Sequence, residues 1–150
     1  MGKRVFFAIL AGVFLGLSGF TFHYAEGLSY LSNDPKACVN CHVMRDNYDS
    51  WQKGSHHAAA TCNDCHVPHS LVPKLVTKLR NGYNHSKGFT FMDFPEPIRI
   101  KPANAMVLQK NCIGCHEKTV QDIAEHDETE EEESVLCVRC HTTVGHGGRK

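Results

Sequence analysis

The sequence predicts a mostly α-helical and irregular fold, in which one N-terminal transmembrane helix carries a small domain with few, short helices. Three observations lead to this prediction. An N-terminal run carries no charge, one pentapeptide occurs four times and uses all eight cysteines, and only 41% of the 150 residues are hydrophobic. So polar a chain builds a stable domain with the help of cross-links, metals or cofactors rather than a large apolar core. Its formal net charge of zero disfavours nucleic acid as a partner.

The apolar run VFFAILAGVFLGLSGFTF extends from Val5 to Phe22. Eighteen helical residues span roughly 27 Å, which is the thickness of the hydrocarbon core of a bilayer. Lys3 and Arg4 precede the run, so the positive-inside rule predicts that residues 1–25 form a cytoplasmic tip and a transmembrane anchor. The run is too long for a signal peptide and lacks a good cleavage site, so we expect an uncleaved, single-pass anchor in the cytoplasmic (inner) membrane.

The pattern Cys-x-x-Cys-His occurs four times, and no cysteine lies outside it. In this pattern two thiols add to the vinyl groups of a haem, and the adjacent histidine reaches the iron. The sequence therefore predicts four covalently bound haems c in a periplasmic domain, which fill its interior in place of apolar side chains. The attachment cysteines are Cys38, Cys41, Cys62, Cys65, Cys112, Cys115, Cys137 and Cys140.

Three other interpretations of the cysteines are less satisfactory. Four disulfides, or two zinc sites of four cysteines each, leave the histidine after every pair unexplained. Metal-bound thiolates also suit a reducing compartment better than an exported domain. A thioredoxin-like redox role needs a βαβ pattern, which the sequence lacks.

The spacing of the motifs predicts two di-haem halves, because their first cysteines are 24, 50 and 25 residues apart. We place these halves in residues 26–70 and 103–150, and a connector joins them. The connector holds an amphipathic helix over residues 73–81, with a proline in its first turn and Gly82 as its stop. Its apolar face fits either the membrane surface or a haem. Residues 94–102 carry three prolines and are expected to run extended.

Each iron takes up to two axial ligands, and their identity sets its potential. Met44 stands two residues after the first motif, and His146 lies in a glycine-bracketed tail that is able to fold back. The acidic run at residues 125–133 is expected to be a solvated loop. The remaining candidate ligands are His23, His56, His57, His69, His85, His126, Met92 and Met106.

The single anchor, the four motifs, the extension of the first motif to CxxCHxM and the CNDCHxPH at the second resemble the NapC/NirT family of membrane-anchored quinol dehydrogenases. The short length and four haems are most similar to the small subunit of the cytochrome c nitrite reductase complex. The resemblance covers nearly the whole chain. It implies that haem 4 takes its second ligand, a lysine, from a catalytic subunit. The other implied ligands are Met44 in place of His42 on haem 1, His66 and His146 on haem 2, His116 and His57 on haem 3, and His141 on haem 4.

The same resemblance implies a quinol site beside haem 1, with Lys78 as the matching lysine. His85 stands where some members of the family carry aspartate, and it either ligates haem 1 or only lines the site. The expected function is oxidation of menaquinol from the membrane pool, with electrons passing through four haems to a soluble periplasmic multihaem reductase that converts nitrite to ammonia. The chain itself is not expected to reduce nitrite.

Two other functions stay open at this point. The chain could serve a different periplasmic reductase, such as one for nitrate, or it could be a plain membrane-tethered electron carrier without a quinol site. A GxxxG pattern at Gly12 and Gly16 also allows two anchors to associate.

Overall fold

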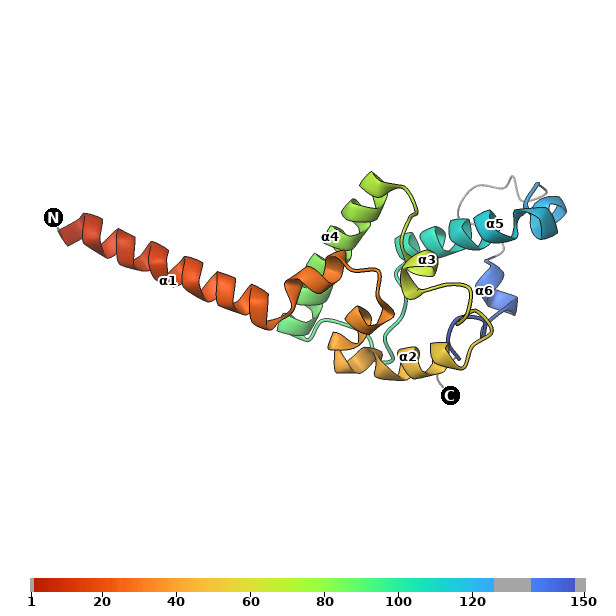
Figure 1. The fold of residues 1–150 in the computed structure, drawn as a ribbon, viewed down its shortest axis with the longest axis horizontal. Coiled ribbons are helices and arrows are strands. Elements are labelled where there is room, and N and C mark those ends of the chain that lie inside the picture. Colours follow the sequence, from red (N-terminus) through yellow and green to blue (C-terminus); the bar gives the residue numbers. More distant parts are fainter. Residues whose placement is uncertain (1, 126–135, 148–150) are drawn as a thin grey trace.

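The computed structural model describes residues 2–125 and 136–147. Within these ranges the chain is helical and irregular and contains no β-strand, as the sequence predicts (Figure 1). Most of the acidic run expected to form a solvated loop, and the candidate ligand His126 within it, lies outside the described residues.

The first helix, α1, extends from Gly2 to Tyr24 and stands away from the rest of the molecule (Figure 1). Its large apolar side chains between Val5 and Phe22 are 49–69% exposed, so the protein itself does not cover them. The helix is long and apolar enough to cross a membrane. Gly27 follows α1 closely, and a Cβ there would collide with the Phe22 ring, so the absence of a side chain permits the sharp exit from the helix.

The domain after α1 has almost no apolar core of its own. Among the described residues, Val67 is the one hydrophobic side chain that is buried, and no side chain is completely buried. A polypeptide of this length normally encloses a cluster of apolar side chains. The interior of this domain therefore has to be supplied by groups other than side chains, as the four Cys-x-x-Cys-His motifs predict.

Short helices carry the first two motifs. The 3₁₀-helix η1 (Gly27–Leu31) leads from the anchor to η2 (Pro35–Asn40), η3 (His42–Met44) and α2 (Arg45–Gln52). The second motif forms α3 (Cys62–His66), which begins with a capping box between Thr61 and Asp64.

The connector helix is longer than the sequence predicts, because α4 extends from Leu71 to Phe91. Pro73 lies in its first turn as expected, but Gly82 does not end it. A glycine inside a helix costs about 1 kcal/mol relative to alanine. The ring of Tyr30 lies 3.5 Å from the position that a Cβ on Gly82 would occupy, which is ordinary van der Waals contact. The helix packs against η1 here and continues past its expected stop, and residues 93–101 then run without regular structure.

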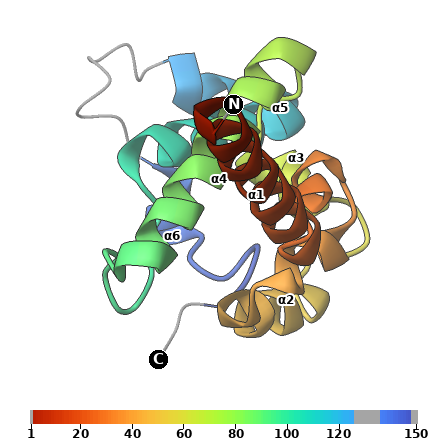
Figure 2. The same ribbon diagram turned by 90° about the vertical axis from the view of Figure 1, so that its left-hand side faces the viewer.

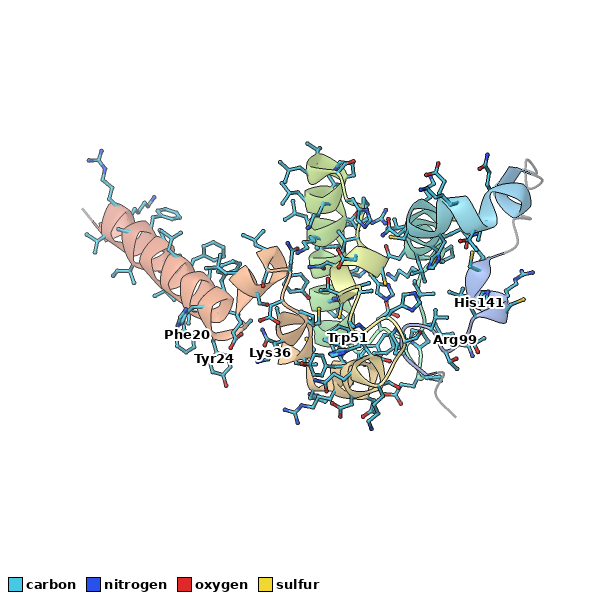
Figure 3. All side chains as sticks on the ribbon, turned by 45° about the vertical axis from the view of Figure 1, so that its right-hand side comes forward. Phe20, Tyr24, Lys36, Trp51, Arg99 and His141 are labelled. Atoms are coloured by element: carbon cyan, nitrogen blue, oxygen red, sulfur yellow. The ribbon has the colours of Figure 1, made fainter. Side chains whose placement is uncertain are left out.

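The second half of the domain begins with α5 (Pro102–Glu125), which contains the third motif and is also longer than expected. The backbone of His116 departs from helical geometry, with φ −105° and ψ 15°, so the helix is kinked at the motif histidine. The fourth motif forms α6 (Cys137–Cys140), with His141 as its C-cap. Along the long axis, α1 occupies one end and α6 lies near the other (Figure 1). The labelled Tyr24 and His141 mark this separation in Figure 3.

Candidate functional site

The first and second motifs touch through their leading cysteines. The Cys62 thiol donates a hydrogen bond to Cys38, and this bond lowers the pKa of Cys38 to about 7. The same bond is the main cause that raises the pKa of Cys62. Two haems attached at these positions are neighbours, because their attachment atoms lie within hydrogen-bond distance.

The second motif contacts the segment that carries the third motif, and that segment contacts the fourth motif. The side chain of Asn111, the residue before the third motif, donates to the carbonyl oxygen of Cys65 at 3.0 Å. The backbone N–H of Cys137 donates to Oε1 of Gln109 at 2.9 Å, which ties the fourth motif to the same helix, α5. Burial, and then the nearby Cys137 and Cys65, raise the pKa of Cys112, in keeping with these contacts. The motifs therefore form one line in chain order, starting beside the anchor.

Two imidazole rings face each other at the second motif. The ring centres of His66 and His146 lie 6.1 Å apart, with an interplanar angle of 15°. An imidazole nitrogen binds a metal at about 2.0–2.1 Å, so two rings on opposite sides of one ion have centres roughly 6.3 Å apart. Burial, and to a smaller extent His146, lower the pKa of His66 to about 4, which keeps the ring in the neutral form that ligates metals. The pair has the spacing of two axial ligands.

The C-terminal tail reaches this position because the end of α2 holds it. The backbone N–H of Gly147 donates to Oγ of Ser50 at 3.1 Å. A Cβ on Gly54 would lie 3.0 Å from the carbonyl oxygen of Gly145, so a glycine at this position permits the close approach. These contacts place His146 although it is 80 residues from His66 in the chain.

At the third motif the structure brings His56, rather than His57, opposite His116. The ring centres of His56 and His116 are 6.0 Å apart, with an interplanar angle of 72°. The Nδ1 atom of His56 lies 3.2 Å from the carbonyl oxygen of Val144, an interaction that fixes the orientation of a ligating histidine. The ring of His57 instead packs edge-on against Trp51, with centres 4.8 Å apart. The expected pairing of His57 with His116 is therefore not what the geometry shows.

The first and last motifs differ in their surroundings. Met44 is half-buried, and the Asn47 amide donates to its sulfur at 3.8 Å, whereas the motif histidine His42 is exposed. His141 is exposed at the far end of the domain, and within the described residues no aromatic ring faces it. Among the described residues, the fourth motif therefore lacks the facing imidazole that the second and third motifs have.

Lys78 lies on α4 close to the first motif. Its side chain is 8% exposed, and Nζ donates to the carbonyl oxygen of Ser32 at 2.6 Å. Desolvation, and then repulsion from Lys74, lower the pKa of Lys78. The ammonium group also lowers the pKa of Cys38, so its charge acts directly on the first motif.

His85 follows Lys78 after two turns and lies on the same face of α4. Its Nδ1 atom is 3.1 Å from the hydroxyl oxygen of Tyr30 in η1. Partial desolvation, and then Lys101, lower the pKa of His85, while burial raises that of Tyr30. At neutral pH the imidazole is therefore uncharged and the phenol protonated, which is the state in which the pair can accept and relay a proton.

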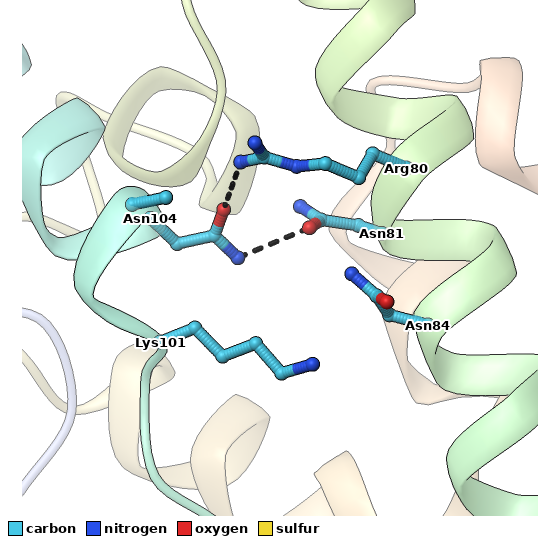
Figure 4. Close-up of a pocket in the computed structure, with 6 residues that line it drawn as sticks. Arg80, Asn81, Asn84, Lys101 and Asn104 are labelled. Atoms are coloured by element: carbon cyan, nitrogen blue, oxygen red, sulfur yellow. Dashed lines mark hydrogen bonds between the residues drawn. The ribbon is translucent and has the colours of Figure 1, made fainter.

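A cavity of about 200 Å³ lies between α4 and the start of α5, one face around the helix from Lys78 (Figure 4). The Arg80 guanidinium donates to Oδ1 of Asn104 at 3.3 Å, and Asn104 donates to Oδ1 of Asn81 at 3.1 Å. Two cations and three amides suit a carboxylate or a phosphate. The cavity is lined by Arg80, Asn81, Asn84, Lys101, Ala103 and Asn104.

Sequence reasoning missed two of these residues and left the choice of a third open. Tyr30 and Ser32 belong to the short segment after the anchor, and no motif marks either of them. His56 was visible as a candidate ligand, but only the fold distinguishes it from its neighbour His57. One signal could have pointed to Tyr30 and Ser32. They lie between the anchor and the first motif, so they are close to any site at the membrane end of the domain.

Comparison with known proteins agrees with this arrangement. The model of the NapC/NirT cytochrome c family, N-terminal region, matches residues 2–150. The cytochrome c-type protein NrfH of Wolinella succinogenes is 38% identical over 95% of this chain and 83% of its own length. NapC of Escherichia coli K12 is 27% identical over 77% of this chain and 69% of its own length. A crystal structure of the cytochrome c nitrite reductase NrfHA complex bound to the HQNO inhibitor gives a TM-score of 0.66 at 28% identity, with 93% of this chain and 90% of that chain covered.

An apolar anchor followed by a line of haem-attachment motifs defines a membrane-anchored multihaem c-type cytochrome. The chain belongs to the NapC/NirT cytochrome c family. It binds haem c covalently and acts in electron transport.

The residues present fit this cofactor. None of the eight cysteines forms a disulfide, so all of them are free to form thioethers. In the described ranges no three His, Cys, Asp or Glu side chains converge to hold a metal ion on their own, so the rival zinc sites have no ligand cluster. Two histidine pairs have the spacing of axial ligands, and the domain lacks a core that haems would displace.

Proposed function

We propose that the chain oxidises menaquinol at the outer face of the cytoplasmic membrane and delivers the electrons to the catalytic subunit of a periplasmic cytochrome c nitrite reductase. The observation that carries this proposal is the placement of Lys78 and His85. Both lie on the face of α4 that packs against η1, at the membrane end of the line of motifs. The names of two similar proteins, NrfH and the NrfHA nitrite reductase complex, support the choice of reductase.

The side chains at this site suit the chemistry of a quinol, which releases two protons and two electrons when it becomes a quinone. Lys78 uses one N–H to bond Ser32, and its remaining N–H groups are able to hold a quinol oxygen. A His85 ring that donates its Nδ1–H to Tyr30 has an unprotonated Nε2, which accepts the first proton. The second proton leaves to water from the other hydroxyl group. The bound haems supply the one-electron acceptors.

The proposed axial ligands follow the geometry at each motif. Haem 1 takes Met44, haem 2 takes His66 and His146, and haem 3 takes His116 with His56 in place of the expected His57. Haem 4 takes His141 and a lysine from the reductase. Lys3 and Arg4 favour a cytoplasmic N-terminus, so haem 4 lies on the periplasmic side, far from the bilayer.

Replacement of Lys78 tests the quinol site. We expect Lys78→Ala to slow reduction of the haems by a menaquinol analogue roughly 10- to 100-fold, because a charged hydrogen-bond donor is lost. Reduction by dithionite should be unchanged. Lys87→Ala, an exposed lysine on the same helix, is the matched control and should behave as wild type. Unaltered quinol kinetics in Lys78→Ala would instead favour a plain electron carrier.

A pair of neighbouring variants tests the ligand assignment. His56→Ala should convert one haem from the low-spin to the high-spin state in visible and magnetic circular dichroism spectra, because one axial bond is lost. His57→Ala should leave the spin state of every haem as in the wild type, since that ring packs on Trp51. The reverse result would restore His57 as the ligand of haem 3.

A second candidate function is supply of electrons to a different reductase, and the similarity to NapC favours it as the alternative. The two functions are separated by mixing the quinol-reduced protein with purified cytochrome c nitrite reductase or with a periplasmic nitrate reductase. Rapid haem reoxidation by the first enzyme and nitrite is the expected result. Reoxidation only by the second enzyme and nitrate would identify the alternative as correct.

A further inference from the structure

The connector helix α4 has an apolar face that the described part of the chain leaves uncovered. Six of its large side chains are 40–72% exposed, although an apolar helix face normally packs against another surface. They recur every three or four residues over the first thirteen residues of the helix, so they form one continuous stripe. The residues of this apolar stripe are Leu71, Val72, Leu75, Val76, Leu79 and Tyr83.

The apolar stripe is continuous with the anchor through η1. The neighbouring face of α4, which carries Lys78 and His85, packs on η1, and η1 follows directly after α1. Leu28 and Leu31 of η1 are themselves 68% and 60% exposed. Apolar surface therefore extends from the end of α1 across η1 onto α4.

The charge of α4 is of one sign. Residues 71–91 contain three lysines and one arginine and no aspartate or glutamate. Arg80 and Lys87 are exposed, so they are available to external anions. Basic residues beside an apolar stripe are the pattern of helices that lie in a bilayer interface containing anionic phospholipids.

The position of α4 relative to α1 also indicates contact with the membrane surface. Figure 1 shows α4 running across the direction of α1 at the C-terminal end of that helix, and Figure 2, viewed from the side of the N-terminus, shows α4 crossing obliquely behind α1. Since α1 crosses the bilayer, a helix that runs across its end lies along the membrane surface. A docking site for a protein partner would not need the apolar stripe, the basic residues and the orientation across α1 to occur together.

We propose that α4 is a second membrane contact, whose apolar stripe enters the leaflet that faces the haem domain while its basic residues bind anionic phospholipid headgroups. Two contacts, α1 and α4, then fix how the haem domain is oriented on the membrane. They also place the face that carries Lys78 and His85 at the lipid boundary. The proposal rests on exposure, charge and arrangement, and it holds whether or not the chain oxidises quinol.

A single introduced thiol tests this contact in the full-length haem-loaded protein, because haem attachment consumes all eight native cysteines. Leu79→Cys carries a nitroxide spin label on the apolar stripe, and Arg80→Cys carries the same label on the next residue, about 100° around the helix. Both proteins are reconstituted into vesicles of phosphatidylethanolamine and phosphatidylglycerol. Electron paramagnetic resonance then measures collisions of each label with oxygen, which partitions into lipid, and with a water-soluble nickel chelate.

We expect the ratio of oxygen to nickel collisions to be about fivefold higher at position 79 than at position 80, as for a helix lying in the interface. Equal ratios would overturn the proposal. A label at position 79 that neither reagent reaches would also overturn it, because a haem, a second copy or another protein would then cover the stripe. Val76→Cys gives an independent position on the same stripe, and the visible haem spectrum confirms that each variant is folded.

Discussion

The two ends of the haem domain are built in opposite ways. At the membrane end, Lys78 is buried and hydrogen-bonded to Ser32, and the His85 ring is held by Tyr30. At the far end, His141 is exposed on the four-residue helix α6. A site that holds and deprotonates a small molecule needs fixed side chains in a partly desolvated setting. A site that delivers electrons to a protein needs an open face, and the difference therefore fits the proposal that the membrane end is the input.

Removal of the proposed base, His85, should have the largest effect on the rate of quinol oxidation. We expect His85→Gln to slow quinol oxidation about 100-fold, at the lower end of the range for loss of a general base. Stopped-flow reduction of the haems by a menaquinol analogue measures the effect. His23→Gln, an exposed histidine in the last turn of α1, is the control. An equally slow control would mean that the loss does not arise from the site.

The pH dependence of the same reaction is the next largest effect. His85 accepts a proton only when neutral, and its pKa is lowered from the ordinary value of 6.5 by desolvation and by Lys101. Quinol oxidation should therefore be insensitive to pH near 7 and fall about tenfold per pH unit once the pH drops below the lowered pKa. In His85→Gln this acid limb should disappear. An acid limb that survives the substitution would assign it to another group.

Loss of the Tyr30 hydroxyl should have a smaller effect. Tyr30→Phe keeps the ring packed over Gly82 but removes the hydrogen bond to His85. One such bond is worth about 1 kcal/mol, so we expect a roughly fivefold slower quinol oxidation with unchanged haem spectra. The apparent pKa of the acid limb should move in the same variant, which separates a positioning role from a change in folding. A wild-type profile would remove Tyr30 from the site.

The far end should give the smallest signal, limited to one haem of the four. Added imidazole should bind the iron of haem 4 in the isolated chain, because among the described residues no ring lies opposite His141. Haem 1, with Met44 as its one proposed ligand, should bind imidazole as well, so the visible spectrum should show two high-spin haems become low-spin. In the complex with the nitrite reductase catalytic subunit, whose lysine occupies the position on haem 4, only one haem should still change. A change in two haems in that complex would contradict the proposed ligand.

Local patterns predicted the parts of the fold that lie within a few consecutive residues. The anchor was readable because eighteen adjacent residues carry no charge, and the haem attachment was readable because each motif is five residues long. The placement of Pro73 in the first turn of the connector helix followed the same logic and is confirmed, although the helix begins at Leu71. Gly82 was wrongly expected to stop the helix, which continues to Phe91 and packs at this glycine against Tyr30, a residue 52 positions away.

The pairing of distant residues was decided by the tertiary structure. His56 and His57 are neighbours of the same chemical type, and only the fold turns one toward His116 and the other toward Trp51. The partners of Lys78 and His85 lie in η1, more than 40 residues earlier, where no motif marks them.

The sequence by itself determined the family, the cofactor and the membrane anchor, because covalent attachment and bilayer insertion depend on contiguous residues. Only the tertiary structure decided which histidines face each other, how the proposed base is held, and that α4 leaves an apolar stripe exposed beside the anchor. These features depend on the packing of segments far apart in the chain, and hydrogen bonds and ring contacts between such segments leave no periodic trace in the sequence.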